Sequence, residues 1–231
     1  MKPGPPAAGR PALVVFDLDG TLIDSIGDLA IAVNRLVGER GGRRLGAGEV
    51  AGMVGEGAGL LVARALAASG ARGEAHEALP RFVEIYDELL PGTTGAYPGV
   101  PGMLDALSGA VPLAVLTNKP TRAARKILSL LDLDRHFLAV VGGDGSLARK
   151  PAPDGLLHLA AEAGVGAADT LMVGDSTIDL LTARAAGARA CLVRYGFGFA
   201  ALDRGTLDGG EAFADSPADV VALVMDGAHG G

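Results

Sequence analysis

Several features that would point to particular classes of protein are scarce or missing in this 231-residue chain. Its single cysteine, Cys191, excludes an intrachain disulfide and predicts a reducing compartment. There is no tryptophan, and aromatic residues make up 4% of the chain, so we expect an aliphatic core. Basic residues do not outnumber acidic ones, and the formal charge of -7 argues against nucleic acid as a partner.

Long apolar runs are absent as well. No stretch is long enough to cross a membrane, which takes about 20 residues. Residues 1–11 contain several prolines and no continuous apolar stretch, unlike a secretory signal. We therefore expect a cytoplasmic protein, monomeric or homodimeric, with no membrane partner. The apolar flanks of Cys191 predict a thiol in the core and not a nucleophile.

Short apolar runs alternate with helical patterns over most of the chain. The runs predict buried strands at residues 12–16, 113–116, 139–141, 170–173 and 190–193. Helical patterns occupy residues 121–131, 154–163 and 177–186, and a Ser-Pro start predicts a last helix from Ser216 through Val224. Alternation at this spacing predicts an α/β fold, a Rossmann-like three-layer core with a parallel sheet covered on both faces.

One helical segment interrupts this alternation after the first strand. Helices are expected at residues 25–38, 59–68 and 74–90, separated by glycine-rich turns and without a convincing strand. We therefore predict a core domain formed by residues 1–24 and 93–231, and an inserted all-helical cap domain of residues 25–92. The two linkers are expected to act as hinges.

Asp17 and Asp19 directly follow the first predicted strand, in the string VVFDLDGTLIDS. Residues two apart in an extended segment point the same way, so both carboxylates can face one site beyond the strand. An EF-hand loop is excluded because its sixth position, which requires Gly, is Leu22 here. The pair alone is equally consistent with a turn or a helix cap.

Further polar residues follow two other predicted strands. Thr117 and Asn118 lie where a strand meets a helix, which is suited to binding phosphate but also to capping the helix. Asp175 follows the strand at 170–173 and suits a hard cation such as Mg²⁺. Asp179 could support that metal, or could be a favourable charge in the first turn of a helix.

Lys150 precedes Pro151, which holds its backbone extended and could aim its ammonium at an anion. A solvated surface lysine is the alternative. Together, the acids, this lysine and the hydroxyl of Thr117 meet the requirements of phosphoryl transfer, which needs a nucleophile, a divalent cation, a fixed positive charge and hydrogen-bond donors.

These four motifs resemble those of the haloacid dehalogenase superfamily. The resemblance implies that Asp17 attacks phosphorus to give an aspartyl phosphate, and that Asp19 protonates the leaving alcohol and then deprotonates water. It implies that Thr117 and Lys150 hold the phosphoryl oxygens. Mg²⁺ would be bound by the Asp17 carboxylate, the Asp19 backbone carbonyl and Asp175. Asp19 distinguishes the chain from the true dehalogenases, which lack an acid there.

Within the superfamily the chain is most similar to the phosphoglycolate phosphatases, through strings at residues 53–58, 97–100, 117–120 and 142–144. This resemblance implies hydrolysis of 2-phosphoglycolate, with the cap closing over the site and selecting the substrate. Phosphatases acting on sugar phosphates, nucleotides or pyrophosphate share the same core motifs. A phosphosugar mutase would need a base in the cap, where His76 is the one histidine and is expected to be exposed. The intact acids and Lys150 argue against a catalytically silent binding module.

The loop Gly55-Glu56-Gly57 in the predicted cap allows two interpretations. It is not a P-loop, since no Gly-Lys-Ser/Thr follows, and Leu60 occupies the third glycine position of a dinucleotide fingerprint. Its backbone N–H groups could contact a substrate carboxylate, or the loop could be a turn between helices. An inward-pointing Glu56 would disfavour an anionic substrate.

Overall fold

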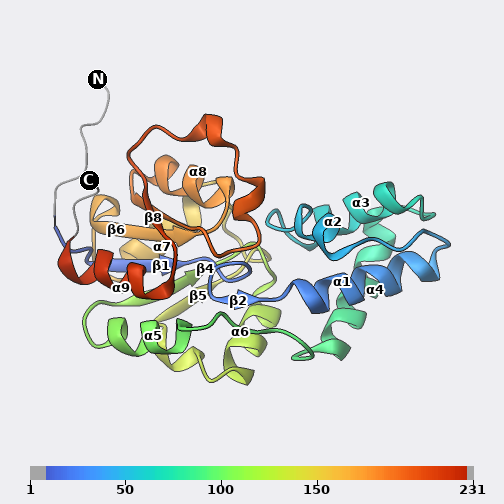
Figure 1. Ribbon diagram of the computed structural model, residues 1–231, viewed down its shortest axis with the longest axis horizontal. Coiled ribbons are helices and arrows are strands. Elements are labelled where there is room, and N and C mark those ends of the chain that lie inside the picture. Colours follow the sequence, from blue (N-terminus) through green and yellow to red (C-terminus); the bar gives the residue numbers. More distant parts are fainter. Residues whose placement is uncertain (1–8, 228–231) are drawn as a thin grey trace.

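A six-stranded parallel sheet forms the centre of the computed structural model, which describes residues 9–227 (Figure 1). The strand order is β5-β4-β1-β6-β7-β8. The strands are β1 (Leu13–Phe16), β4 (Leu113–Leu116), β5 (Ala139–Val141), β6 (Thr170–Gly174), β7 (Arg189–Val193) and β8 (Ala212–Ala214). The five predicted strands are confirmed, and β8 was not predicted. Residues 1–8 and 228–231, including most of the prolines weighed against a signal segment, lie outside the described residues.

Helices cover both faces of the sheet, as predicted. Side chains alternate along β1, so Val14 and Phe16 pack on one face while Leu13 and Val15 pack on the other. The first face is covered by α5 (Val100–Ser108), α6 (Thr121–Leu130) and α9 (Pro217–Asp226). The second is covered by α7 (Asp154–Glu162) and α8 (Thr177–Ala186). Short 3₁₀ turns lie at Asp134–His136, Ala167–Asp169, Phe199–Ala201 and Arg204–Thr206.

The interrupting segment forms a helical lobe beside the sheet, drawn in blue to teal at the right of Figure 1. Its helices are α1 (Ile26–Glu39), α2 (Ala47–Ala51), α3 (Ala58–Ser69) and α4 (Ala75–Leu89). Helix α4 packs against both α1 and α3, burying Phe82 and Ile85. We use the name helical lobe for residues 26–89. The domain boundaries at 24/25 and 92/93 remain a prediction.

The two linkers to the helical lobe run side by side, which was not predicted. β2 (Ile23–Asp24) and β3 (Gly95–Ala96) form a short antiparallel ribbon. Next to it, the buried carboxylate of Asp28 in α1 accepts four hydrogen bonds of 2.7–3.0 Å, from the backbone N–H and the hydroxyl of both Thr93 and Thr94. These four hydrogen bonds between Asp28 and residues Thr93 and Thr94, which we call the Asp28 clasp, attach the first turn of α1 to the chain that leads back to the sheet.

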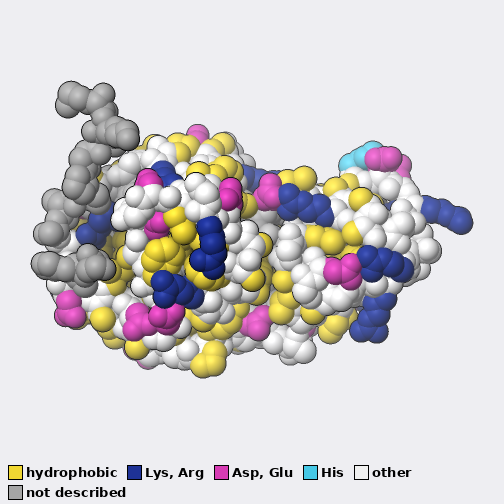
Figure 2. Space-filling model, turned by 45° about the horizontal axis from the view of Figure 1, so that its top comes forward, with side chains coloured by type: hydrophobic (Ala, Val, Ile, Leu, Met, Phe, Trp, Pro, Cys, Tyr) yellow, Lys and Arg dark blue, Asp and Glu magenta, His cyan; other side chains and the backbone are white. Residues whose placement is uncertain are grey.

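The distribution of charged side chains and the burial of the single cysteine follow what the composition predicted. Acidic and basic side chains are interspersed over both lobes on the face shown in Figure 2. Within residues 9–227, no helix combines the length and apolarity needed to span a bilayer. Cys191 is buried in β7, and burial raises the pKa of its thiol to about 12, so the prediction of a core thiol is confirmed.

Candidate active site

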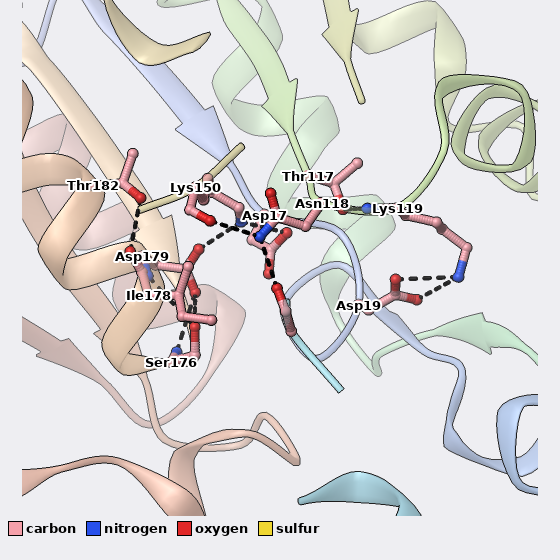
Figure 3. A network of polar contacts seen from close by, with 11 residues as sticks. Asp17, Asp19, Thr117, Asn118, Lys119, Lys150, Ser176, Ile178, Asp179 and Thr182 are labelled. Atoms are coloured by element: carbon pink, nitrogen blue, oxygen red, sulfur yellow. Dashed lines mark hydrogen bonds and ion pairs between the residues drawn. The ribbon is translucent and has the colours of Figure 1, made fainter. Parts of the chain in front are cut away.

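Asp17 and Lys150 meet at the carboxyl end of the sheet (Figure 3). Asp17 follows β1 and its backbone N–H donates to the Val173 carbonyl of the neighbouring strand, which fixes its position. The Lys150 ammonium lies 2.8 Å from Asp17 Oδ1 and 2.6 Å from Asp179 Oδ1. Lys150 is 5% exposed, so the alternative of a solvated surface lysine is wrong.

Asp179 has the helix N-terminal role that the sequence allowed and also holds Lys150, whereas its support of a metal remains a prediction. Its Oδ2 accepts hydrogen bonds from the backbone N–H and hydroxyl of Ser176, which completes a capping box at the start of α8. Its Oδ1 holds Lys150. One carboxylate therefore stabilises a helix N-terminus and fixes the ammonium against Asp17.

The backbone of two glycine-containing loops packs closely against the Asp175 carboxylate. Its Oδ2 accepts a 2.7 Å hydrogen bond from the backbone N–H of Gly198. A Cβ added at Gly20 or Gly196 would fall 2.0–2.3 Å from Asp175 atoms, so only glycine allows these two loops to approach the carboxylate. Gly20 also has a φ of +87°, which favours glycine.

The acidic cluster of Asp17, Asp175 and Asp179 has the chemistry of a divalent cation site. Each residue offers one carboxylate oxygen, and these oxygens lie within 4.8 Å of one another. Burial raises the pKa of Asp17 to about 7; Lys150 opposes this rise and Asp179 adds to it. Burial, followed by repulsion from Asp179 and Asp17, holds the pKa of Asp175 well above its ordinary value. A divalent cation bound by these carboxylate oxygens would offset the excess of negative charge. The residues therefore fit Mg²⁺, which prefers oxygen ligands.

Asp19 points away from this cluster, toward a second buried lysine. Lys119 Nζ lies 2.9 and 3.1 Å from the two carboxylate oxygens of Asp19 and donates a 2.8 Å hydrogen bond to the Tyr86 hydroxyl. Ser25 donates a further hydrogen bond to Asp19. Although burial disfavours its charged form, Asp19 and Tyr86 raise the pKa of Lys119 above its ordinary value.

Thr117 and Asn118 follow β4 beside Asp17. Thr117 is buried, and its hydroxyl oxygen accepts a hydrogen bond from the Lys119 backbone N–H. The Asn118 amide donates to the carbonyl oxygens of Lys150 and of Gly55 in the helical lobe, at 3.0 and 2.9 Å. Asn118 thus connects the Lys150 loop to the loop that precedes α3. Phosphate binding by Thr117, Asn118 and Lys150 remains a prediction.

The loop Gly55-Glu56-Gly57 faces the site through its glycines. Gly55 and Gly57 line the cavity described below, whereas Glu56 is not among its lining residues and pairs with Arg64 of α3. The inward-pointing acid that would oppose an anionic substrate is therefore absent from this cavity wall.

A cavity of about 400 Å³ lies between the sheet and the helical lobe. Asp17, Asp19 and Thr117 line it from the sheet side, and Phe82 and Tyr86 line it from α4. The sequence predicted the first three residues as site residues but missed Lys119 and Tyr86. Lys119 is 100 positions from its partner Asp19, so its burial could not be read from neighbouring residues.

Comparison with known proteins identifies the family. The model of the haloacid dehalogenase-like hydrolases matches residues 14–193. The chain belongs to this family of hydrolases, as its motifs predicted.

Within this family, the chain is similar to several proteins named phosphoglycolate phosphatase. The chain is 43% identical over 196 residues to a phosphoglycolate phosphatase of Rhodospirillum rubrum, covering 81% of each chain. It is 38% identical over 218 residues to a plasmid-encoded phosphoglycolate phosphatase of Cupriavidus necator, covering 91% of this chain and 92% of the relative. The crystal structure of a predicted phosphoglycolate phosphatase from Haemophilus somnus matches with a TM-score of 0.86 at 29% identity, covering 93% and 98% of the two chains. The predicted similarity to phosphoglycolate phosphatases is confirmed.

Proposed function

We propose that this protein is a Mg²⁺-dependent phosphate monoester hydrolase that converts 2-phosphoglycolate to glycolate and inorganic phosphate through an aspartyl-phosphate intermediate. The observation that carries the proposal is the meeting of Lys150 and the acidic cluster at Asp17, which lines the cavity together with Asp19. The relatives named phosphoglycolate phosphatase support the choice of substrate.

We assign each step of the reaction to one residue of the site. The Asp17 carboxylate attacks phosphorus and the bond to the ester oxygen breaks, while Asp19 gives its proton to the leaving alcohol. Asp19 then takes a proton from a water molecule, which attacks the phosphoryl group and frees Asp17. Lys150 and the Thr117 hydroxyl stabilise the phosphoryl oxygens. Splitting hydrolysis into these two displacements uses one residue as nucleophile and another as proton carrier.

Bound Mg²⁺ would supply a Lewis acid that neutralises phosphoryl charge. The residues proposed to hold it are Asp17, Asp175 and the backbone carbonyl of Asp19, with Asp179 in support. Asp179 also keeps Lys150 against Asp17, so the lysine stays in place whether or not the nucleophile is phosphorylated.

Phosphate release from a panel of phosphorylated metabolites tests the proposal. The panel contains 2-phosphoglycolate, sugar phosphates, nucleotides and pyrophosphate, each with Mg²⁺. We expect 2-phosphoglycolate to have the highest kcat/KM. Release of phosphate from none of them would contradict the proposal, and isomerisation of a sugar phosphate would identify a mutase. The mutase has no support in the helical lobe, where His76 is exposed and does not line the cavity.

A further inference from the structure

Lys119 is a buried cation that the proposed chemistry does not use. It is 8% exposed, although lysines are seldom buried unless they are paired. In the described residues its ammonium contacts the two carboxylate oxygens of Asp19 and the Tyr86 hydroxyl, and it lies 4.6 Å from the centre of the Tyr86 ring. The cation for the phosphoryl group is Lys150, which is bound to Asp17 and Asp179 instead. Lys119 is therefore available for a different part of the substrate.

The position of Asp19 fixes which part of the substrate Lys119 can reach. As the proton carrier, Asp19 must come within about 2.6–3.2 Å of the ester oxygen. The Lys119 ammonium is 2.9 Å from the same carboxylate, on the side toward Tyr86. A substrate group that contacts this ammonium therefore lies near the ester oxygen, as a group on the adjacent carbon would.

A carboxylate at that position fits the site chemically. The Lys119 ammonium is a positive charge held between the Asp19 carboxylate and the Tyr86 hydroxyl, where an anion can pair with it. Burial raises the pKa of Tyr86, which keeps its proton. The Tyr86 oxygen accepts from Lys119, leaving its own O–H free to donate to the same anion. Two donors, one from the sheet side and one from α4, thus converge beside the proton carrier.

We propose that Lys119, assisted by Tyr86, binds a carboxylate on the carbon next to the ester oxygen and so selects O-phosphorylated 2-hydroxy acids as substrates. The inference rests on the proposed function and deepens it, because it names the residues that recognise the leaving group. Before substrate binds, the ion pair with Asp19 neutralises the buried ammonium of Lys119. Apolar side chains such as Leu61 and Phe82 also line this cavity, together with the charged residues Asp87, Arg122, Asp144 and Arg149.

The test compares two substrates of nearly equal size, 2-phosphoglycolate and 2-hydroxyethyl phosphate, which carries a neutral hydroxymethyl group in place of the carboxylate. For Lys119→Met we expect kcat/KM for 2-phosphoglycolate to fall by about 100-fold or more, as when a buried charge loses its partner. We expect 2-hydroxyethyl phosphate to lose much less, so the ratio of the two kcat/KM values changes by at least about tenfold. Lys126→Met, in α6 and directed to the Asp87 carbonyl instead of Asp19, is the control and should leave the ratio unchanged.

Equal losses for both substrates would overturn the inference, because Lys119 would then act only through Asp19. A wild-type enzyme that hydrolyses both substrates without preferring the acid would overturn it too, while leaving the phosphatase in place. Hydrolysis of neither substrate would overturn the proposed function and this inference with it.

If Lys119→Met does not fold, a second variant and an inhibition measurement test the same inference. For Tyr86→Phe we expect a smaller fall in the same ratio. With the wild-type protein, glycolate should inhibit hydrolysis competitively at concentrations at which ethylene glycol does not. Equal, weak inhibition by both would overturn the inference.

Discussion

The two ends of the cavity are built from different parts of the molecule. At the phosphate end, Asp17 and Asp175 directly follow strands of the sheet. Lys150 joins Asp17 to Asp179 of α8, and Asp175 accepts a hydrogen bond from the Gly198 backbone N–H. At the leaving-group end, Asp19 and Lys119 come from the sheet side, but their partner Tyr86 belongs to α4 of the helical lobe. The difference suggests a division in which the sheet fixes the chemistry and the lobe takes part in choosing the alcohol that leaves.

The largest effect should come from removing the nucleophile. Asp17→Asn should lower kcat by about 10⁴-fold or more for every substrate, because the amide cannot form the phosphoenzyme. Phosphate release measures the loss, and circular dichroism shows that the variant is folded. Turnover similar to that of the wild type would contradict the assignment of Asp17 and would remove the basis for calling this the phosphate end.

Removing divalent cations should also affect all substrates alike. We expect EDTA to abolish phosphate release and Mg²⁺ to restore it, since the acidic cluster carries an excess of negative charge. Mg²⁺ at 100 times its Kd should also stabilise the folded protein by about 2.7 kcal/mol, measured by thermal unfolding. Asp175→Asn should reduce that stabilisation. Full activity in EDTA would contradict the metal assignment.

A smaller effect is expected from the Asp28 clasp, which lies outside the cavity. Asp28→Asn replaces one carboxylate oxygen with an N–H₂ group that cannot accept the hydrogen bonds of Thr93 or Thr94. We expect a loss of about 2–3 kcal/mol in the free energy of unfolding at pH 7, measured in urea. Asp24→Asn, which alters one exposed hydrogen bond, should cost less than about 1 kcal/mol.

The difference in the free energy of unfolding between wild type and Asp28→Asn should depend on pH in a defined direction. Burial opposes the charged form of Asp28, but the four donors outweigh it and the pKa of the carboxyl is lowered. Its contribution to stability is therefore complete above the unfolded pKa of about 3.9, and is lost as the pH falls through the lower folded value. The difference between wild type and Asp28→Asn should be constant near pH 6–8 and shrink below about pH 4. A constant difference down to pH 3 would contradict the clasp.

The sequence predicted the phosphate end better than the leaving-group end, for a physical reason. Asp17, Thr117 and Asp175 directly follow buried strands, and parallel strands bring their carboxyl ends to one edge of the sheet. The contact between Lys119 and Tyr86 depends instead on how the helical lobe packs against the sheet. Local pattern carries no information on that packing, because both residues are separated from their partners by tens of positions.

Short elements escaped prediction for a related reason. β8 is Ala-Phe-Ala and has one large apolar residue, whereas the predicted β5 has two. The β2–β3 ribbon has two residues in each strand, too few for an apolar run to form a pattern. Helix α5 begins with Val-Pro-Gly, which is typical of a turn, although Pro is well tolerated in a first helical turn. These elements are stabilised by the sheet and helices against which they pack.

Trapping the phosphoenzyme tests the central claim most directly. The protein is mixed with 2-phosphoglycolate and Mg²⁺, quenched in acid within the first turnover and digested, and its peptides are analysed by mass spectrometry. We predict one added phosphoryl group on Asp17 of the wild type, and none on the same peptide of Asp17→Asn. Phosphate release from the wild type with no phosphoryl group on Asp17, or with the group on another residue, would contradict the account.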